Sequence, residues 1–125
     1  MDRNESGNLG EEIACQFLVR KGFKVVERNY RRPWGEIDIV AQKGDEVRFV
    51  EVKAVSREIS GSISREMDYR PEEMVHRSKL EKVARTATLY MDEKRDKREY
   101  QIDVVGVIMD PQKRLARCRL FEQVL

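Results

Sequence analysis

The feature that most constrains this chain is a pair of strand-like runs joined by a very short turn. Residues 36–41 and 47–53 are rich in β-branched residues, and Gly44 lies in a polar turn between them. A connection this short leaves no room for a crossover helix, so the two runs are expected to pair as an antiparallel hairpin. The chain is therefore predicted to fold around a sheet.

Flanking patterns predict the remaining elements. Apolar residues at helical spacing predict a helix over residues 8–22, and a strand follows over residues 23–30. A second amphipathic helix is predicted over residues 71–91, and strands over residues 102–109 and 115–121. The order is αβββαββ. Because the second helix is long enough for a parallel crossover, the fold class is α/β, with a mixed five-stranded sheet flanked by helices.

The size and composition fit one domain over residues 1–125. The chain is 40% hydrophobic, and its apolar runs are far shorter than the roughly 20 residues of a membrane-spanning helix. The N-terminus is polar and lacks the apolar core of a signal peptide, so a cytoplasmic location and no membrane partner are expected. Cys15 and Cys118 lie inside periodic segments and are predicted to be small buried residues.

Several classes of chemistry lack their motifs. The sequence contains no phosphate-binding glycine loop, no dinucleotide fingerprint and no G-x-S-x-G serine elbow. A single histidine excludes a histidine-rich metal centre. With 25 basic and 23 acidic residues, the net charge of +2 gives little support for nucleic-acid binding, so any such function must rest on local chemistry.

Charged side chains within the hairpin are the strongest candidates for a site. Side chains alternate between the faces of a strand, so Asp38 and Glu36 are expected on one face of the first run. The apolar residues Ile37, Ile39 and Ala41 are then expected on the other face. On the second run, Glu51 and Lys53 share a face. If the hairpin brings the polar faces together, Asp38, Glu51 and Lys53 converge.

Two interpretations fit this cluster. Asp38 and Glu51 could hold Mg²⁺ through oxygen, while Lys53 stabilises negative charge or assists a water molecule that attacks phosphorus. Alternatively, the three groups form a salt bridge on a solvated sheet face. Three ionisable groups among β-branched residues favour a site.

The predicted first helix adds one more acidic residue. Its apolar face is formed by Leu9, Ile13 and Phe17, and Glu11 flanks that face at its edge. Glu12 is expected to point to water.

Asp38, followed after the turn by Glu51, Val52 and Lys53, resembles the D-to-(D/E)xK signature of restriction-endonuclease-like nucleases. The order of elements also resembles the core of that superfamily. More closely, the chain resembles the YraN-like uncharacterised proteins, relatives of archaeal Holliday junction resolvases. The resembling motifs span nearly the whole chain: Gly10-Glu11-Glu12, Arg28-Asn29-Tyr30, Gly35-Glu36-Ile37-Asp38, Phe49-Val50-Glu51-Val52-Lys53, Lys79 and Asp103-Val104-Val105.

The resemblance implies a role for each matching residue. Asp38 and Glu51 are the implied metal ligands, with the Val52 carbonyl, and Lys53 is the implied catalytic lysine. Glu11 matches an acidic residue that holds the metal through water, although a helix-capping or ion-paired glutamate is the alternative. The implied cofactor is Mg²⁺, with Mn²⁺ as a substitute.

Basic residues are the candidates for nucleic-acid binding. Arg28, Arg31 and Arg32 precede the ligand strand and could contact phosphates, while the neighbouring Trp34 could stack on a base. The alternative is a solvated basic turn with a packed tryptophan.

Two further candidates come from the resemblance. Lys79 matches a family position, and Val55 stands where the family has a basic residue, so Arg57 would have to replace that phosphate contact. The loop over residues 54–70 could close over bound DNA.

The resemblance therefore implies a metal-dependent DNA endonuclease with branched DNA as a candidate substrate. A homodimer is implied because a four-way junction needs two symmetric cuts. The alternatives are a catalytically inactive nucleic-acid-binding or assembly module on a nuclease fold, and a protein-interaction domain.

Overall fold

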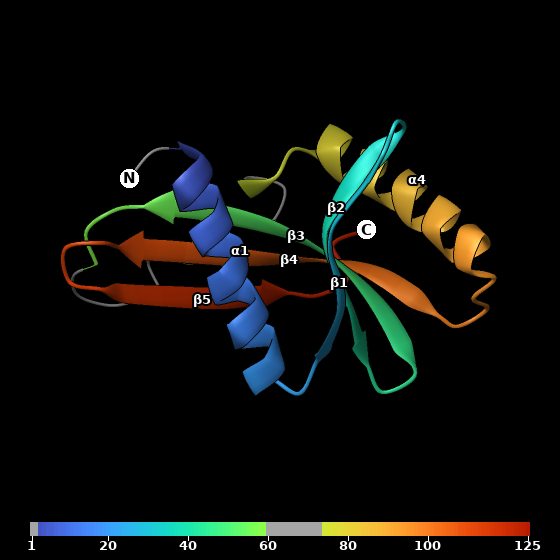
Figure 1. Cartoon of the computed structure of the whole chain (residues 1–125), viewed down its shortest axis with the longest axis horizontal. Coiled ribbons are helices and arrows are strands. Elements are labelled where there is room, and N and C mark those ends of the chain that lie inside the picture. The colour runs from blue at the N-terminus through green and yellow to red at the C-terminus, as the bar shows by residue number, and fades with distance from the viewer. Residues whose placement is uncertain (1–2, 60–73) are drawn as a thin grey trace.

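The computed structural model describes residues 3–59 and 74–125 (Figure 1). Its elements are α1 (Arg3–Arg20), β1 (Lys24–Arg32), β2 (Gly35–Lys43), β3 (Glu46–Ser56), α4 (Arg77–Lys94), β4 (Tyr100–Asp110) and β5 (Leu115–Phe121). The predicted order αβββαββ is confirmed. Within the described residues, no helix combines the length and the apolar character needed to cross a membrane.

The strands form one mixed sheet in the order β1-β2-β3-β4-β5. The hairpin of β2 and β3 is antiparallel, as predicted, and β3 and β4 are parallel. The parallel pair is possible because the chain returns through α4 between these two strands. This arrangement confirms the α/β fold class and is consistent with a restriction-endonuclease-like core.

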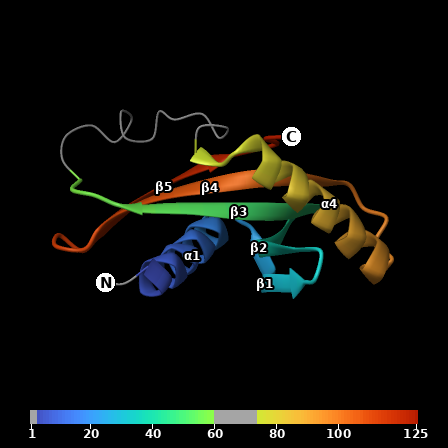
Figure 2. The same cartoon turned by 90° about the horizontal axis from the view of Figure 1, so that it is seen from above.

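The two helices cover opposite sides of the sheet (Figure 2). On one side, α1 buries Ala14, Cys15 and Leu18 against strand residues that include Ile39 and Val50. Two separate hydrophobic clusters therefore hold the helices to the sheet.

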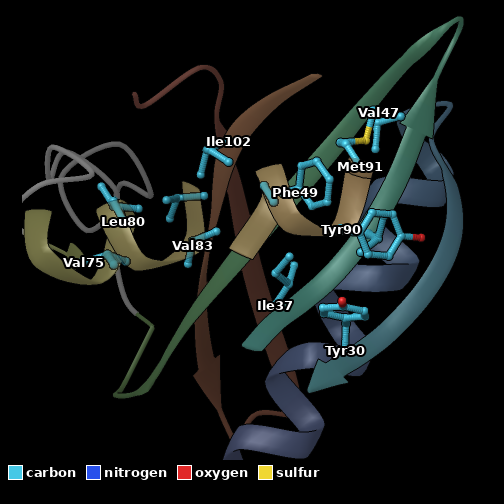
Figure 3. Packing of buried hydrophobic residues seen from close by; sticks show 13 residues of the cluster. Tyr30, Ile37, Val47, Phe49, Val75, Leu80, Val83, Tyr90, Met91 and Ile102 are labelled. Carbon is cyan, nitrogen blue, oxygen red and sulfur yellow. The ribbon is translucent and has the colours of Figure 1, made fainter. Parts of the chain in front are cut away.

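The second cluster lies between α4 and the sheet (Figure 3). Its centre is aromatic, because the ring of Tyr90 lies edge-on to both Tyr30, at 5.0 Å between centroids, and Phe49, at 5.4 Å. The observed helix begins at Arg77, and the predicted first turn at residues 71–73 lies outside the described residues. The predicted loop over residues 54–70 begins too early, because β3 continues to Ser56, and residues 60–70 of it lie outside the described residues.

Two predictions of side-chain direction are wrong. Ile37 packs in the α4-side cluster, whereas Ile39 and Ala41 pack in the α1-side cluster, so simple alternation fails around Asp38. Leu9 was expected on the buried face of α1, but 42% of its surface is exposed. The helix instead turns Gly10 toward the sheet.

The cysteines match their prediction only partly. Cys15 is buried, but Cys118 is half-buried, and both are free.

Candidate active site

Strands β2 and β3 separate at Asp38, and this separation creates the site. The recorded pairing of the two strands runs from Lys43 and Glu46 as far as Ile39 and Val50. One residue further, the Oδ2 atom of Asp38 accepts a hydrogen bond from the backbone N–H of Val52, with a distance of 2.8 Å. The side chain thus takes the place of a main-chain acceptor, which leaves the strands wedged apart.

The gap opens into a cleft of ≈ 500 Å³ lined by residues from α1, β2, β3 and α4. Every residue predicted to bind the metal or to act in catalysis lines this cleft, and so does Lys79. These residues are Glu11, Asp38, Glu51, Val52, Lys53 and Lys79. The predicted convergence of side chains from distant positions is therefore present in the fold.

Glu51 is the least exposed charged residue of this cleft, with 8% of its surface accessible. Burial is the main cause that raises the pKa of Glu51 to about 9, and a hydrogen bond with Asp38 and the charge of Asp38 raise it further. The positive charge of Lys79 acts in the opposite direction. Two carboxyl groups in hydrogen-bond contact either share a proton or need a cation between them.

Glu11 lies half-buried at the edge of the packed face of α1, as the helical spacing predicted. Burial, followed by the charge of Asp38, raises the pKa of Glu11, while a hydrogen bond from Asn29 and the charges of Arg28 and Arg31 oppose this shift. Glu11 does not cap the helix, because α1 begins at Arg3 and Glu11 therefore lies near its middle.

The position of Glu11 depends on a close approach between α1 and β3. A methyl group added to Gly10 would lie 2.5 Å from the Cβ atom of Ala54, closer than real Cβ atoms come to one another. The absence of a side chain at Gly10 lets the helix cross the strand where the strand enters the cleft.

Asn29 also helps to position Glu11. Its backbone is left-handed, with φ of 53°, a conformation that asparagine tolerates better than most residues. This places its amide beside Glu11, at the point where β1 faces the Asp38 region of β2.

The two lysines occupy different parts of the cleft. Lys53 is exposed on β3 and pairs in register with Gly106 of β4. The Nζ atom of Lys79 lies 3.8 Å from a carboxylate oxygen of Glu36, at the rim.

The predicted phosphate-binding arginines lie outside this cleft. Arg28 donates to Glu12 at 2.7 Å, and Arg32 donates to Glu93 at 2.9 Å. Arg31 lies 3.7 Å from Glu36. The backbone N–H of Arg57 donates to the carbonyl of Met109. Of the residues predicted to contact nucleic acid, only Lys79 lines this cleft.

Among the described residues, no three histidine, cysteine, aspartate or glutamate side chains lie close enough to enclose a metal by themselves. The donor set nevertheless fits a hard cation at the adjacent carboxyl groups of Asp38 and Glu51. A cation there would relieve their repulsion and would take its remaining ligands from a backbone carbonyl and water. Glu11 lies at a position suited to contact such water.

Sequence reasoning missed three contributors: Gly10, Asn29 and Glu36. Gly10 and Asn29 position Glu11, and Glu36 holds Lys79 at the rim. Each lies inside a motif that carries the family resemblance, and this membership could have marked all three as candidates.

The model of one protein family, described as "Uncharacterised protein family UPF0102", matches residues 10–107. The chain belongs to this family. The matched range contains Glu11, Asp38, Glu51 and Lys53. UPF0102 is the family of the YraN-like proteins and has a restriction-endonuclease-like fold, so the resemblance seen in the sequence is confirmed.

Relatives named "UPF0102 protein" match over most of their length. The relative from Dictyoglomus thermophilum is 38% identical over 111 residues, which cover 87% of this chain and 86% of the relative. That from Thermotoga petrophila is 41% identical over 97 residues, covering 78% and 81%. That from Moorella thermoacetica is 38% identical over 117 residues, covering 93% and 91%.

A solved structure, "The structure of Pyrococcus Furiosus SfsA in complex with Ca2+", is similar at a TM-score of 0.38 and 13% identity. The alignment covers 97% of this chain and 64% of that chain. A likeness this low gives no guide to function.

Proposed function

We propose that the protein is a metal-dependent endonuclease that hydrolyses phosphodiester bonds in DNA. The observation that carries the proposal is the contact between the carboxyl groups of Asp38 and Glu51 in a cleft that Lys53 also lines. Placing the buried carboxyl group of Glu51 against the half-buried one of Asp38 costs stability, which is the expected signature of a functional rather than a structural pair.

The residues divide the work of hydrolysis. Asp38, Glu51 and the Val52 carbonyl would hold Mg²⁺, which would supply a more acidic water ligand and positive charge opposite the phosphate. Lys53 orients the attacking water and stabilises the negative charge that develops on the phosphoryl oxygens. The oxygen of that water bonds to phosphorus and gives up a proton to solvent, while the bond from phosphorus to the leaving oxygen breaks and that oxygen takes a proton from solvent. Glu11 would accept hydrogen bonds from water molecules bound to the cation.

The first test is cleavage of labelled single-stranded, duplex, flap and four-way-junction DNA with Mg²⁺, Mn²⁺ or EDTA. Glu51→Gln, Asp38→Asn and Lys53→Ala should each reduce the cleavage rate about 100-fold or more. Glu81→Gln is the matched control, because Glu81 is an exposed glutamate of α4 that pairs with Arg77. Cleavage retained in all three site variants would reject this site.

A catalytically inactive nucleic-acid-binding module is the second candidate. It is favoured by the hydrogen bond between Glu51 and Asp38, because a shared proton satisfies the pair without a metal. Such a module would bind DNA in a salt-sensitive manner without Mg²⁺, and its affinity would not respond to the Asp38 and Glu51 substitutions.

Branched DNA and a homodimer are finer parts of the proposal. Paired cuts in a four-way junction need two active sites related by symmetry. Preference for the junction in the cleavage panel, together with a dimer mass by light scattering, would support both. A monomer that cleaves flaps and junctions equally would argue against them.

A further inference from the structure

A second hollow continues from the active-site cleft along α4. We call it the Trp34 groove; it has a volume of ≈ 480 Å³ and is lined chiefly by Arg31, Arg32, Trp34, Lys79, Lys82 and Arg85. It shares Glu36 and Lys79 with the active-site cleft. A single polynucleotide strand could therefore pass from one hollow to the other without leaving the surface.

The Trp34 groove is strongly basic in a chain whose net charge is only +2. Five cationic side chains line it with one carboxylate, that of Glu36. Arg31 and Lys79 both lie near Glu36, and Arg32 pairs with Glu93. Lys82 and Arg85 pair with no carboxylate in the described part of the chain, so their charge is available to a polyanion.

Trp34 is not packed into the fold, which contradicts the alternative that its turn is merely a basic loop around a buried ring. The side chain is 53% exposed among these cations. Exposed aromatic rings beside basic groups are typical of surfaces that stack bases while holding phosphates.

The turn that carries Trp34 is fixed against α4. Gly35 approaches the hydroxyl of Thr86 so closely that no side chain could fit, and that hydroxyl donates to the carbonyl of Lys82 at 2.9 Å. The backbone next to Trp34 therefore lies directly against the helix that supplies Lys82 and Arg85.

We propose that the Trp34 groove binds unpaired nucleotides that flank the scissile phosphate, with the indole stacked on a base and Lys82 and Arg85 on phosphates. Stacking requires a base whose face is free, and bases inside a duplex do not offer one. The substrate class is thus DNA with a single-stranded segment next to the cut. This inference rests on the proposed nuclease function, since the flanking strand reaches the Asp38–Glu51 pair past Lys79.

The protein has one tryptophan, so its intrinsic fluorescence reports directly on Trp34. Using Glu51→Gln to suppress cleavage, we expect DNA with a single-stranded overhang to quench this fluorescence strongly and blunt duplex of equal length to quench it little. Equal quenching by both, or DNA binding without quenching, would overturn the proposal.

A second test measures the DNA affinity of variants by electrophoretic mobility shift. Trp34→Ala should weaken binding to overhang DNA about tenfold and Trp34→Phe should restore most of it, while affinity for blunt duplex stays the same. Lys82→Ala with Arg85→Ala should weaken binding and reduce its salt dependence, whereas Arg77→Ala on the same helix is the matched control. If the overhang preference survives Trp34→Ala, the inference fails.

The two proposals fail separately. Cleavage that survives Glu51→Gln, with overhang-specific quenching intact, rejects the nuclease site but not the groove. Cleavage lost in Glu51→Gln, with no effect of Trp34→Ala on overhang binding, rejects the groove but not the nuclease.

Discussion

Glu51 on β3 and Asp103 on β4 are both buried carboxylates, with 8% and 0% of their surfaces exposed. Asp103 has three donors at 2.9 Å: the guanidinium of Arg48, the amide of Gln101 and the backbone N–H of Gln123. Glu51 faces a second carboxyl group instead. The same sheet therefore fully compensates one buried charge and leaves the other in need of a proton or a cation.

The surroundings of Asp103 also show how a neutral residue helps to hold a buried carboxylate. Gln101 lies two residues before Asp103 on β4 and carries no charge. Gln101 donates to Asp103, and Arg48 supplies the charge from β3. A basic residue at position 101 is thus not needed to hold Asp103.

The largest effect should come from Arg48→Met, which leaves Asp103 buried without its cation. We expect the free energy of unfolding to fall by about 3–5 kcal/mol, measured by urea denaturation followed by circular dichroism. Combining the change with Asp103→Leu should recover much of this loss, because neither charge is then buried. If Arg48→Met alone were as stable as the wild type, Arg48 would not compensate the charge of Asp103.

Glu51→Gln should stabilise the protein, in contrast to Arg48→Met. In metal-free buffer at neutral pH, we expect it to increase the free energy of unfolding by about 1–3 kcal/mol, because a neutral amide removes the cost of the buried acid. Thermal denaturation in EDTA measures this. Mg²⁺ should stabilise the wild type and not the variant.

The pH dependence gives a separate check on Glu51. Its pKa in the folded protein is raised from 4.5 to about 9, so the folded state holds this proton more tightly than the unfolded state. The wild type should therefore lose stability relative to Glu51→Gln as the pH rises from about 4.5 toward 9, and the two should converge at lower pH. A stability difference that does not change with pH would contradict the raised pKa.

A smaller effect is expected from Gly10→Ala, which would push α1 away from β3 at Ala54 and carry Glu11 away from the Asp38–Glu51 pair. We expect a loss of about 1–2 kcal/mol in unfolding free energy, together with slower cleavage. Gly7→Ala on the same helix is the control, because nothing lies within 4 Å of a methyl group there. It should raise stability by about 0.5–1 kcal/mol.

Element order could be predicted because it rests on local periodicity and short connections. The hairpin follows from its short turn, the crossover helix follows from helical periodicity, and the shared face of Glu51 and Lys53 follows from alternation along β3. Glu11 was placed correctly at the edge of its helix face, since helical spacing alone determines that.

The local direction of Ile37 and the exposure of Leu9 could not be predicted in the same way. Ile37 leaves the expected face because the strands separate at Asp38, where a side chain rather than the backbone accepts the Val52 N–H. Leu9 lies outside the packed face because α1 crosses β3 at Gly10. Both outcomes depend on contacts between segments distant in the sequence, which periodicity does not contain.

The hydrogen bond from Val52 to Asp38 also limits how a cation can be held. With Oδ2 already engaged by the backbone, Asp38 presents chiefly its other oxygen to the cleft. Ligation by this residue would then be monodentate, and a six-coordinate ion such as Mg²⁺ would fill its open positions with water and phosphate oxygens. If a cation binds here, the hydrogen bond that fixes the seam between the two strands would thereby leave room beside the ion for both water and substrate.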